Sequence, residues 1–343
     1  MIAPLISIIL STAIIFTSLS AQAANAASQV NVYSARKEAL IKPLLDRFTQ
    51  QTGITVNLVT GKADALLKRL ETEGRNTPAD MLITTDAGRL HRAQLANVLQ
   101  AVSSEALEQV IPAIYREPQG YWYGLSLRAR PIFYLKGKVD PANLSSYEAL
   151  ADDKFKGQIC IRSSNNIYNQ SLVASMISAN GIAATEKWAS GLVKNMAKPP
   201  RGGDRDQIRA AASGQCSIAI ANTYYFAAMQ AGNKAKDKAA ASKVALFWPN
   251  QDGRGAHVNI SGAGITKYAA QRDNAVRLLE FLANKESQKW YAENNHEYPI
   301  RKDVAASQLL QSWGEFKSDA INLSVLGKNN PDAVKLMDRA GWK

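Results

Sequence analysis

The chain has few of the side chains that usually bind transition metals. It contains only two cysteines and three histidines in 343 residues. The histidines, His91, His257 and His296, are isolated from one another and show no metal-ligand spacing. Copper and zinc sites are built mainly from clustered thiolates and imidazoles, and two cysteines are too few for a structural zinc site. We therefore expect each histidine to be structural or exposed rather than a metal ligand.

The sequence also lacks the short motifs of common enzymes. It has no H-E-x-x-H, no G-x-S-x-G, no P-loop and no Rossmann glycine pattern. Its carboxylates are scattered, so no acid–base pair can be assigned. The alternative class is an exported hydrolase with Ser126 or Ser261 as nucleophile, but the sequence offers no general base near either serine. We therefore expect a protein that is not an enzyme.

Long apolar runs are confined to the N-terminus. Residues 2–20 are apolar with interspersed Ser and Thr, and no charged side chain precedes Arg36. A small-residue segment follows, with A-x-A patterns that end at Ala23 and Ala26. This pattern predicts a cleavable signal peptide over residues 1–26 and export to the periplasm, although the usual positive n-region is missing. The alternative is an uncleaved N-terminal anchor, and no later stretch approaches the length of a membrane span.

The charge balance is strongly basic, with a formal net charge of +12. Strong basicity is found in proteins that bind nucleic acids or membrane surfaces. Here Lys and Arg are spread along the chain and interleaved with acids, as in KAKDKAAASK. This pattern indicates a solvated basic surface, and export argues against a nucleic-acid partner.

The rest of the chain begins as an alternation of strands and helices. About 315 residues remain after the leader, which suits two domains better than one core. The periodicity of apolar residues predicts strands over 30–34, 54–60 and 80–85, and helices over 38–53, 62–74 and 87–98. Such alternation is typical of an α/β protein with a mainly parallel sheet covered on both faces. Ligands bind such sheets beyond the carboxyl ends of the strands.

A second unit begins near residue 126. Residues 122–135 are apolar and strand-like, and the runs 158–164 and 216–223 read as further strands of this unit. Residues 244–269 hold two strand-like pieces about a Gly-rich loop, and residues 271–294 form an amphipathic helical stretch. We infer that two long strands cross between two α/β lobes and leave a cleft between them.

This organisation assigns two discontinuous segments to each lobe. The N-terminal lobe is expected to comprise residues 27–127 plus about 254–303. The C-terminal lobe is expected to comprise residues 128–253 plus about 304–343.

The two cysteines each lie in a short strand-like run of an exported chain. Cys160 is in QICIRSS and Cys216 is in GQCSIAIANT. Disulfides persist in exported proteins, so one reading is a bond between the two. The other reading is a pair of small, buried core residues.

Three tyrosines follow these same runs. Tyr168 lies eight residues after Cys160, and Tyr224, which precedes Tyr225, lies eight residues after Cys216. If the two strands are parallel and adjacent, the three phenols converge on one point at the carboxyl end of the sheet. The alternative for each is a half-buried aromatic side chain with one hydrogen bond.

Three converging phenols are suited to a hard, highly charged cation. A phenol has a pKa near 10, so a phenolate at neutral pH needs a strong positive charge close by. A trivalent hard cation supplies that charge, and three phenolates neutralise Fe(III). Six-coordination then leaves room for a small anion or water. Arg36, at the end of the first strand, and Arg128 or Arg130 in the LRAR segment are candidates to hold such an anion, although each is also a candidate for a surface or interlobe ion pair.

Five segments of the chain resemble the ferric-iron-binding periplasmic components of bacterial iron ABC transporters. They are VYSAR, PADMLITTDAGRLHRA, YGLSLRARPIFY, IRSSNNIYNQSLVAS and IANTYYF. The resemblance spans nearly the whole chain after the leader, in matching order, and the paired tyrosines are its most specific mark. It implies a two-lobed, transferrin-like cleft of the type II periplasmic binding fold. It also implies that Tyr168, Tyr224 and Tyr225 ligate Fe(III) and that arginines bind a synergistic anion such as carbonate.

The sequence departs from this family at one place. After VYSAR many members carry a metal-binding His, often followed by Tyr, where this chain has Lys37-Glu38. Glu38 is a candidate substitute ligand, although a solvated helix start is the simpler reading. Tyr33 is a further candidate, for which we favour a structural role. The site therefore resembles the subgroup with three tyrosines completed by an exogenous anion or solvent.

These observations predict a monomeric binding protein that carries Fe(3+) to an inner-membrane ABC permease. The alternative is a binding protein that captures an anion or small organic solute through Arg36, Arg128 and hydroxyl groups of the cleft.

Overall fold

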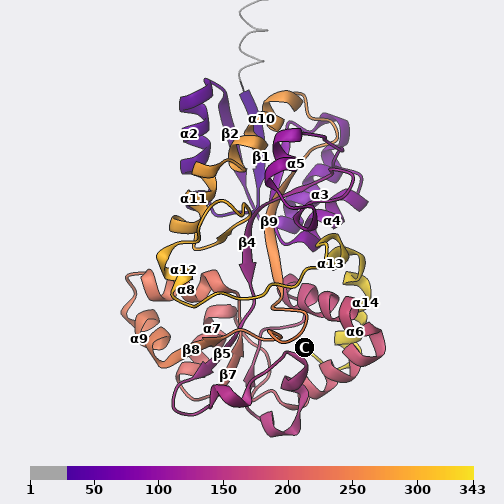
Figure 1. Cartoon of the computed structure of the whole chain (residues 1–343). Coiled ribbons are helices and arrows are strands. Elements are labelled where there is room, and N and C mark those ends of the chain that lie inside the picture. Colours follow the sequence, from indigo (N-terminus) through magenta and orange to yellow (C-terminus); the bar gives the residue numbers. More distant parts are fainter. Residues whose placement is uncertain (1–28) are drawn as a thin grey trace, which may run out of the picture.

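The computed structural model describes residues 29–343, and the predicted signal peptide therefore lies outside the described residues. Within these residues ten strands form two separate sheets, of six and four strands (Figure 1). In chain order they are β1 (Gln29–Ser34), β2 (Thr55–Thr60), β3 (Met81–Thr85), β4 (Tyr123–Ala129), β5 (Ile132–Leu135), β6 (Ile159–Cys160), β7 (Ile218–Ile220), β8 (Val244–Phe247), β9 (Val258–Ile265) and β10 (Tyr298–Pro299).

The six-stranded sheet has the order β10-β4-β9-β3-β1-β2. β1 is parallel to both β2 and β3, as the alternation of strands and helices predicts. β9 is antiparallel to β3 and to β4, so a strand from late in the chain lies in the interior of this sheet, between β4 and β3. Residues of both ends of the sequence therefore share one sheet.

The four-stranded sheet has the order β6-β7-β5-β8. β6 and β7 are parallel neighbours, with Ile159 opposite Ile218 and Cys160 opposite Ala219. β5 is antiparallel to β7 and to β8. This sheet supplies the parallel, adjacent pair of strands on which the sequence argument about the tyrosines depends.

Two segments connect the sheets. The apolar run 122–135 is not one long strand, because Arg130-Pro131 divides it into β4 in the larger sheet and β5 in the smaller one. The chain returns between β8 and β9, and Arg130 N donates to His257 O (3.0 Å) where the two segments pass each other. Figure 1 shows β4 and β9 side by side: β4 runs toward the smaller sheet, and the antiparallel β9 runs back from it.

The helices are α2 (Lys42–Thr52), α3 (Ala63–Glu73), α4 (Ala87–Leu95), α5 (Glu105–Val110), α6 (Ile167–Lys194), α7 (Asp204–Ala212), α8 (Thr223–Ala231), α9 (Ala235–Lys243), α10 (Arg272–Leu282), α11 (Lys285–Asn294), α12 (Gln308–Gln311), α13 (Ser324–Lys328) and α14 (Asn330–Arg339). Six short 3₁₀ turns accompany them in the described chain: η1 (Glu38–Leu40), η2 (Gly74–Asn76), η3 (Ala113–Tyr115), η4 (Pro141–Asn143), η5 (Glu148–Ala151) and η6 (Asp153–Phe155). Among residues 29–343 there is no helix with the length and apolar character needed to cross a membrane.

Local sequence explains where several helices begin and end. The predicted helix 38–53 breaks at Ile41 into η1 and α2, and Gly53 ends α2 in the left-handed region (φ 73°). The Asp86 side chain accepts from Gly88 N and caps α4, and Asp is one of the residues preferred at this position. The predicted stretch 271–294 divides into α10 and α11, because the Asn284 side chain accepts from Ser287 N and starts a new helix.

The C-terminal segment joins the two sheet regions a third time. After β10 the chain passes α12 and α13 and ends in α14, which packs against α6 (Figure 1). Trp248, which follows β8, stacks on Phe316 of this segment with ring centroids 3.9 Å apart. The Trp248 indole N–H also donates to Trp313 O (3.0 Å). The segment therefore fastens to the smaller sheet region by aromatic contacts.

Candidate functional site

The three tyrosines lie at the first turns of two helices that follow neighbouring parallel strands. Tyr168 is the second residue of α6, and its backbone N–H is bound by the Asn166 side chain, the N-cap of that helix. Tyr224 and Tyr225 are the second and third residues of α8. Because β6 and β7 are parallel and adjacent, both helices start at the same edge of the smaller sheet.

The structure brings the three phenols together, as the equal spacing predicts. The Tyr224 hydroxyl donates to the Tyr168 hydroxyl over 3.1 Å. The rings of Tyr224 and Tyr225 lie with their centroids 4.3 Å apart. All three tyrosine residues are half-buried.

Burial and mutual proximity disfavour phenolates in the empty site. Burial, followed by the neighbouring Tyr168 and Tyr225, raises the pKa of Tyr224 well above its usual value of 10. Burial, followed by Tyr168, raises the pKa of Tyr225 to about 12. A bound cation would reverse this preference, because its charge stabilises the deprotonated oxygen.

Arg128, on β4, faces this cluster with part of its guanidinium unused. Its side chain is 2% exposed, and its Cζ lies 5.9 Å from the ring centroid of Tyr168. Nη1 donates to Ser261 Oγ (3.1 Å), whereas buried Nε and Nη2 have no hydrogen-bond partner in the described chain. Within residues 29–343 no carboxylate forms an ion pair with it. Arg128 is thus a buried cation with two donors available beside the phenols.

Arg36 lies beside Arg128 but its charge is balanced. Its Nη2 pairs with Glu297 Oε2 at 3.0 Å, and its Nη1 donates to Ser261 Oγ at 2.6 Å. Burial opposes the charged form, but Glu297, then Tyr291, outweighs it and keeps the pKa of Arg36 above its usual value. Ser261 therefore bridges the two arginines.

The two serines considered as nucleophiles both belong to this polar group. Ser126 Oγ donates to Glu297 Oε2 (2.7 Å), and Ser261 accepts from both arginines. Among the described contacts neither serine meets a histidine. Their hydroxyls are used to hold Arg36, Arg128 and Glu297 in place.

Arg130 binds protein groups through both terminal nitrogens, whereas its buried Nε has no hydrogen-bond partner in the described chain. Nη1 donates to Asp204 Oδ2 and to Asn222 Oδ1, both at 2.9 Å, and Nη2 donates to Asn169 Oδ1 at 2.7 Å. The side chain is 1% exposed and is paired with a carboxylate. It therefore differs from Arg128, which has no carboxylate partner.

The two remaining candidates do not join the tyrosine cluster. The Tyr33 hydroxyl donates to the Glu73 carboxylate on α3 (2.9 Å), and the Arg69 guanidinium lies 4.7 Å from its ring centroid. This arrangement matches the structural role that the sequence favours. Glu38 is exposed in η1, as expected of a solvated helix start, and the described contacts do not connect it to the tyrosines.

Sequence reasoning missed two arginines that face the tyrosine rings. The Cζ of Arg162 lies 5.6 Å from the ring centroid of Tyr168, and Nη1 of Arg162 pairs with Asp204 Oδ1 at 3.2 Å. The Cζ of Arg205, on α7, lies 5.3 Å from the ring centroid of Tyr225. Arg162 comes directly after the strand-like run QICI, so the rule that identified Tyr168 would also have found it. The spacing of Arg205 gives no such signal.

A disulfide lies behind the tyrosine-bearing turns. Cys160, the last residue of β6, is bonded to Cys216, which precedes β7, with their Cα atoms 6.0 Å apart. The bond ties together the two chain segments whose continuations carry Tyr168 and the Tyr224–Tyr225 pair.

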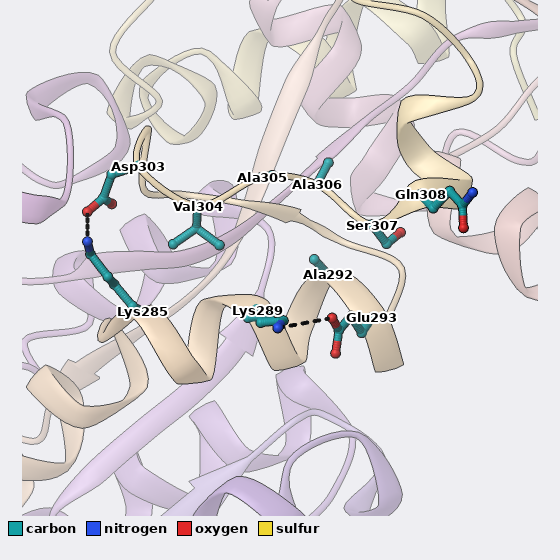
Figure 2. A pocket seen from close by; sticks show the side chains of 10 residues that line it. All are labelled: Lys285, Lys289, Ala292, Glu293, Asp303, Val304, Ala305, Ala306, Ser307 and Gln308. Carbon is teal, nitrogen blue, oxygen red and sulfur yellow. Dashed lines mark ion pairs between the residues drawn. The ribbon is translucent and has the colours of Figure 1, made fainter.

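One surface hollow in the described chain has none of the three tyrosines in its lining. Figure 2 shows this hollow of about 510 Å³ between α11 and the segment 303–308. Its four charged side chains pair with each other, Lys285 with Asp303 at 3.0 Å and Lys289 with Glu293 at 3.9 Å. Because the charged side chains of this hollow are already paired, we do not take it as the candidate metal site.

A family model described as "Bacterial extracellular solute-binding protein" matches residues 44–318. Among relatives, the chain is 48% identical to Iron uptake protein A1 of Synechocystis over 315 residues, which cover 92% of this chain and 88% of the relative. It is 26% identical to the Major ferric iron-binding protein of Neisseria meningitidis serogroup B, over 93% of this chain and 94% of the relative.

Solved structures show the same architecture. The Trichodesmium protein IdiA (FutA), in complex with iron and citrate ligands, matches with a TM-score of 0.90 and 50% identity, over 92% of this chain and 100% of that chain. A ferric binding protein from Campylobacter jejuni matches with a TM-score of 0.87 and 39% identity, over 92% and 100% of the two chains. The fold is therefore that of the type II periplasmic binding proteins, with two lobes and two crossing segments between them.

Proposed function

Because the chain belongs to the family of bacterial extracellular solute-binding proteins, we propose that it captures ferric iron through phenolate oxygens. The ligands are Tyr168, Tyr224 and Tyr225, and the observation that carries the proposal is the meeting of their side chains at one edge of the smaller sheet. The names of the two relatives and of the two solved structures, all of which refer to iron, support the choice of cargo.

The donor set suits this cargo. Three hard phenolate oxygens balance the charge of Fe(III), and the remaining positions of a six-coordinate ion accept a small anion or water. Arg128 is the residue best placed to hold a synergistic anion such as carbonate, since its Nε and Nη2 are unused. Arg36 is second, because Glu297 already balances its charge, and Arg130 serves the protein scaffold instead.

Iron capture by two lobes implies a delivery step. The division of the strands between two sheets supports an N-terminal lobe of residues 27–127 plus about 254–303 and a C-terminal lobe of residues 128–253 plus about 304–343. The lobes close on the ion and together present a surface to an inner-membrane ABC permease. The protein acts as a monomer in the periplasm after removal of residues 1–26.

Capture of an anion or small organic solute alone is the disfavoured alternative. Of the two arginines proposed for it, only Arg128 has free donors and no carboxylate partner. A single free guanidinium beside three phenols is better suited to an anion that binds together with a metal than to an anion that is the transported solute.

The test is a titration of the iron-free protein with ferric citrate. Wild-type protein should develop a visible phenolate-to-iron absorption band, and the Tyr224→Phe/Tyr225→Phe double variant should lose it. Tyr33→Phe is the matched control, because this buried phenol binds Glu73 and not the cluster, so its band should persist. A wild-type protein that stays colourless and binds no iron tightly would sink the proposal.

A further inference from the structure

Arg130 belongs to the first crossing segment, at the point where it passes the second, and its backbone is hydrogen-bonded on both sides. Its N–H donates to His257 O (3.0 Å), and its carbonyl accepts from the Tyr147 hydroxyl (2.8 Å). The same hydroxyl accepts from His257 N at 3.1 Å. The position of the Arg130 backbone is therefore determined by the crossing segments.

The side chain of Arg130 reaches from there to the starts of three helices. It binds Asn169 on α6, directly after Tyr168, and Asn222, the N-cap of α8 two residues before Tyr224. Its third partner is Asp204, the first residue of α7. One planar guanidinium thus contacts both helices that carry the phenols.

The partners of Arg130 are themselves hydrogen-bonded to the backbone at the helix starts, so the position of the guanidinium determines the positions of those helix starts. Asn169 Nδ2 donates to Arg162 O (2.7 Å) and to Ser163 O (3.1 Å) in the turn before α6. Asp204 Oδ2 also accepts from Asn222 N (2.7 Å) at the start of α8. With both ends fixed, the guanidinium acts as a rigid spacer between the first turns of α6 and α8.

We propose that Arg130 is a positioning residue that sets the separation between the Tyr168 phenol and the Tyr224–Tyr225 pair. The inference rests on the proposed function for the identity of the ligand, and on the contacts above for the geometry. Arginine suits the role because its fork directs several donors in one plane, whereas lysine offers a single point charge. Arg130 itself does not touch the ion.

The sharpest test is Asn222→Ala. The Asn222 side chain makes no capping hydrogen bond to α8, so its replacement removes the contact with Arg130 without removing a cap. Iron affinity should fall by about 10- to 100-fold, the usual effect of losing an outer-shell partner of a metal ligand, and the absorption band should shift. Thermal unfolding of the iron-free variant should stay close to that of wild type.

Arg130→Lys and Arg209→Lys form a matched pair. Arg130→Lys keeps a positive charge beside Asp204 but replaces the planar fork, which reaches the partners from two nitrogens, with a single nitrogen, so it should weaken iron binding as Asn222→Ala does. Arg209 is itself a residue of α7, donates to Asp237 through Nε (2.9 Å) and Nη2 (2.7 Å), and has no hydrogen bond to either tyrosine-bearing turn in the described chain. Arg209→Lys should therefore leave iron affinity and the band unchanged.

The outcomes distinguish the positioning role of Arg130 from the proposed iron-binding function. If wild type binds iron and Asn222→Ala binds it equally well with the same band, the positioning role is wrong and the proposed function stands. If wild type binds no iron, the proposed function fails, and crystal structures of iron-free wild type and Asn222→Ala decide the positioning role. A separation between the Tyr168 and Tyr224 hydroxyls that widens from 3.1 Å in the variant supports that role, and an unchanged separation overturns it. The same readouts from Asn169→Ala decide the matter if Arg130→Lys does not fold.

Discussion

Replacing Arg128 with glutamine should weaken iron binding strongly when carbonate is present and only slightly when it is absent. The guanidinium has two buried nitrogens, Nε and Nη2, with no partner in the described chain. A carbonate that accepted from both would gain two charge-assisted hydrogen bonds of roughly 1.5–3 kcal/mol each. Their loss, taken as about 4 kcal/mol, corresponds to about a thousandfold in affinity.

Arg36→Gln is the control that distinguishes anion binding from structure. Arg36 is paired with buried Glu297, so its replacement leaves an uncompensated carboxylate, which costs about 3–5 kcal/mol in buried pairs. We therefore expect Arg36→Gln to lower the free energy of unfolding more than it changes the carbonate dependence. Arg128→Gln should show the opposite pattern, because no carboxylate loses its partner.

The assay is a competition titration of Fe(III) against a chelator of known affinity, in carbonate-free and carbonate-containing buffers, with urea unfolding of each iron-free variant alongside. An equal loss of iron affinity by Arg128→Gln in both buffers would refute the anion role. So would a carbonate dependence that disappears in Arg36→Gln and persists in Arg128→Gln.

Two further predictions concern protons and the disulfide. Burial raises the pKa of Tyr224 and of Tyr225, so these phenols carry protons in the empty site and must lose them when the metal binds. Iron affinity should therefore rise with pH, by about tenfold per pH unit for each proton released. Chelator competition between pH 5 and pH 8 checks this, and an affinity that does not change with pH contradicts it. The double variant Cys160→Ser/Cys216→Ser removes a disulfide between residues 56 apart in the sequence. The free energy of unfolding, measured with urea, should fall by about 4 kcal/mol because the unfolded chain is no longer cross-linked. A change under about 1 kcal/mol would show that the disulfide contributes little to stability.

The sequence predicted the tyrosine cluster because the evidence for it is local. Equal spacing after two strand-like runs places Tyr168 and Tyr224 together only if the strands are parallel neighbours, and β6 and β7 are. The helix caps at Gly53 and Asp86 were predictable for the same reason, since each depends on residues a few positions away.

The roles of the arginines were not predictable, because they depend on partners far away in the sequence. Arg36 pairs with Glu297, 261 residues later, and Arg130 pairs with Asp204, 74 residues later. From the sequence alone, Arg36 and Arg128 are the candidates for anion binding, with Arg130 as an alternative in the same LRAR segment. The structure distinguishes them by whether a carboxylate already balances each charge. Likewise, the run 122–135 reads as one strand, and only the second sheet explains its division at Pro131.

The positive charges around the tyrosines link the binding of a trivalent cation to the binding of an anion. Arg128, Arg162 and Arg205 each place Cζ within 6 Å of a phenol ring centroid, and of these three Arg162 alone has an ion-pair partner in the described chain, Asp204. This positive surrounding repels bare Fe(III) but stabilises phenolates, and Arg128 lowers the pKa of Tyr224 against the larger effect of burial. Under the proposed function, metal and anion therefore depend on each other: three phenolates cancel the charge of the ion, and the arginine excess remains for the anion to balance. Each should bind more tightly when the other is present, as thermodynamic linkage requires. The Arg128 experiment measures this mutual dependence directly.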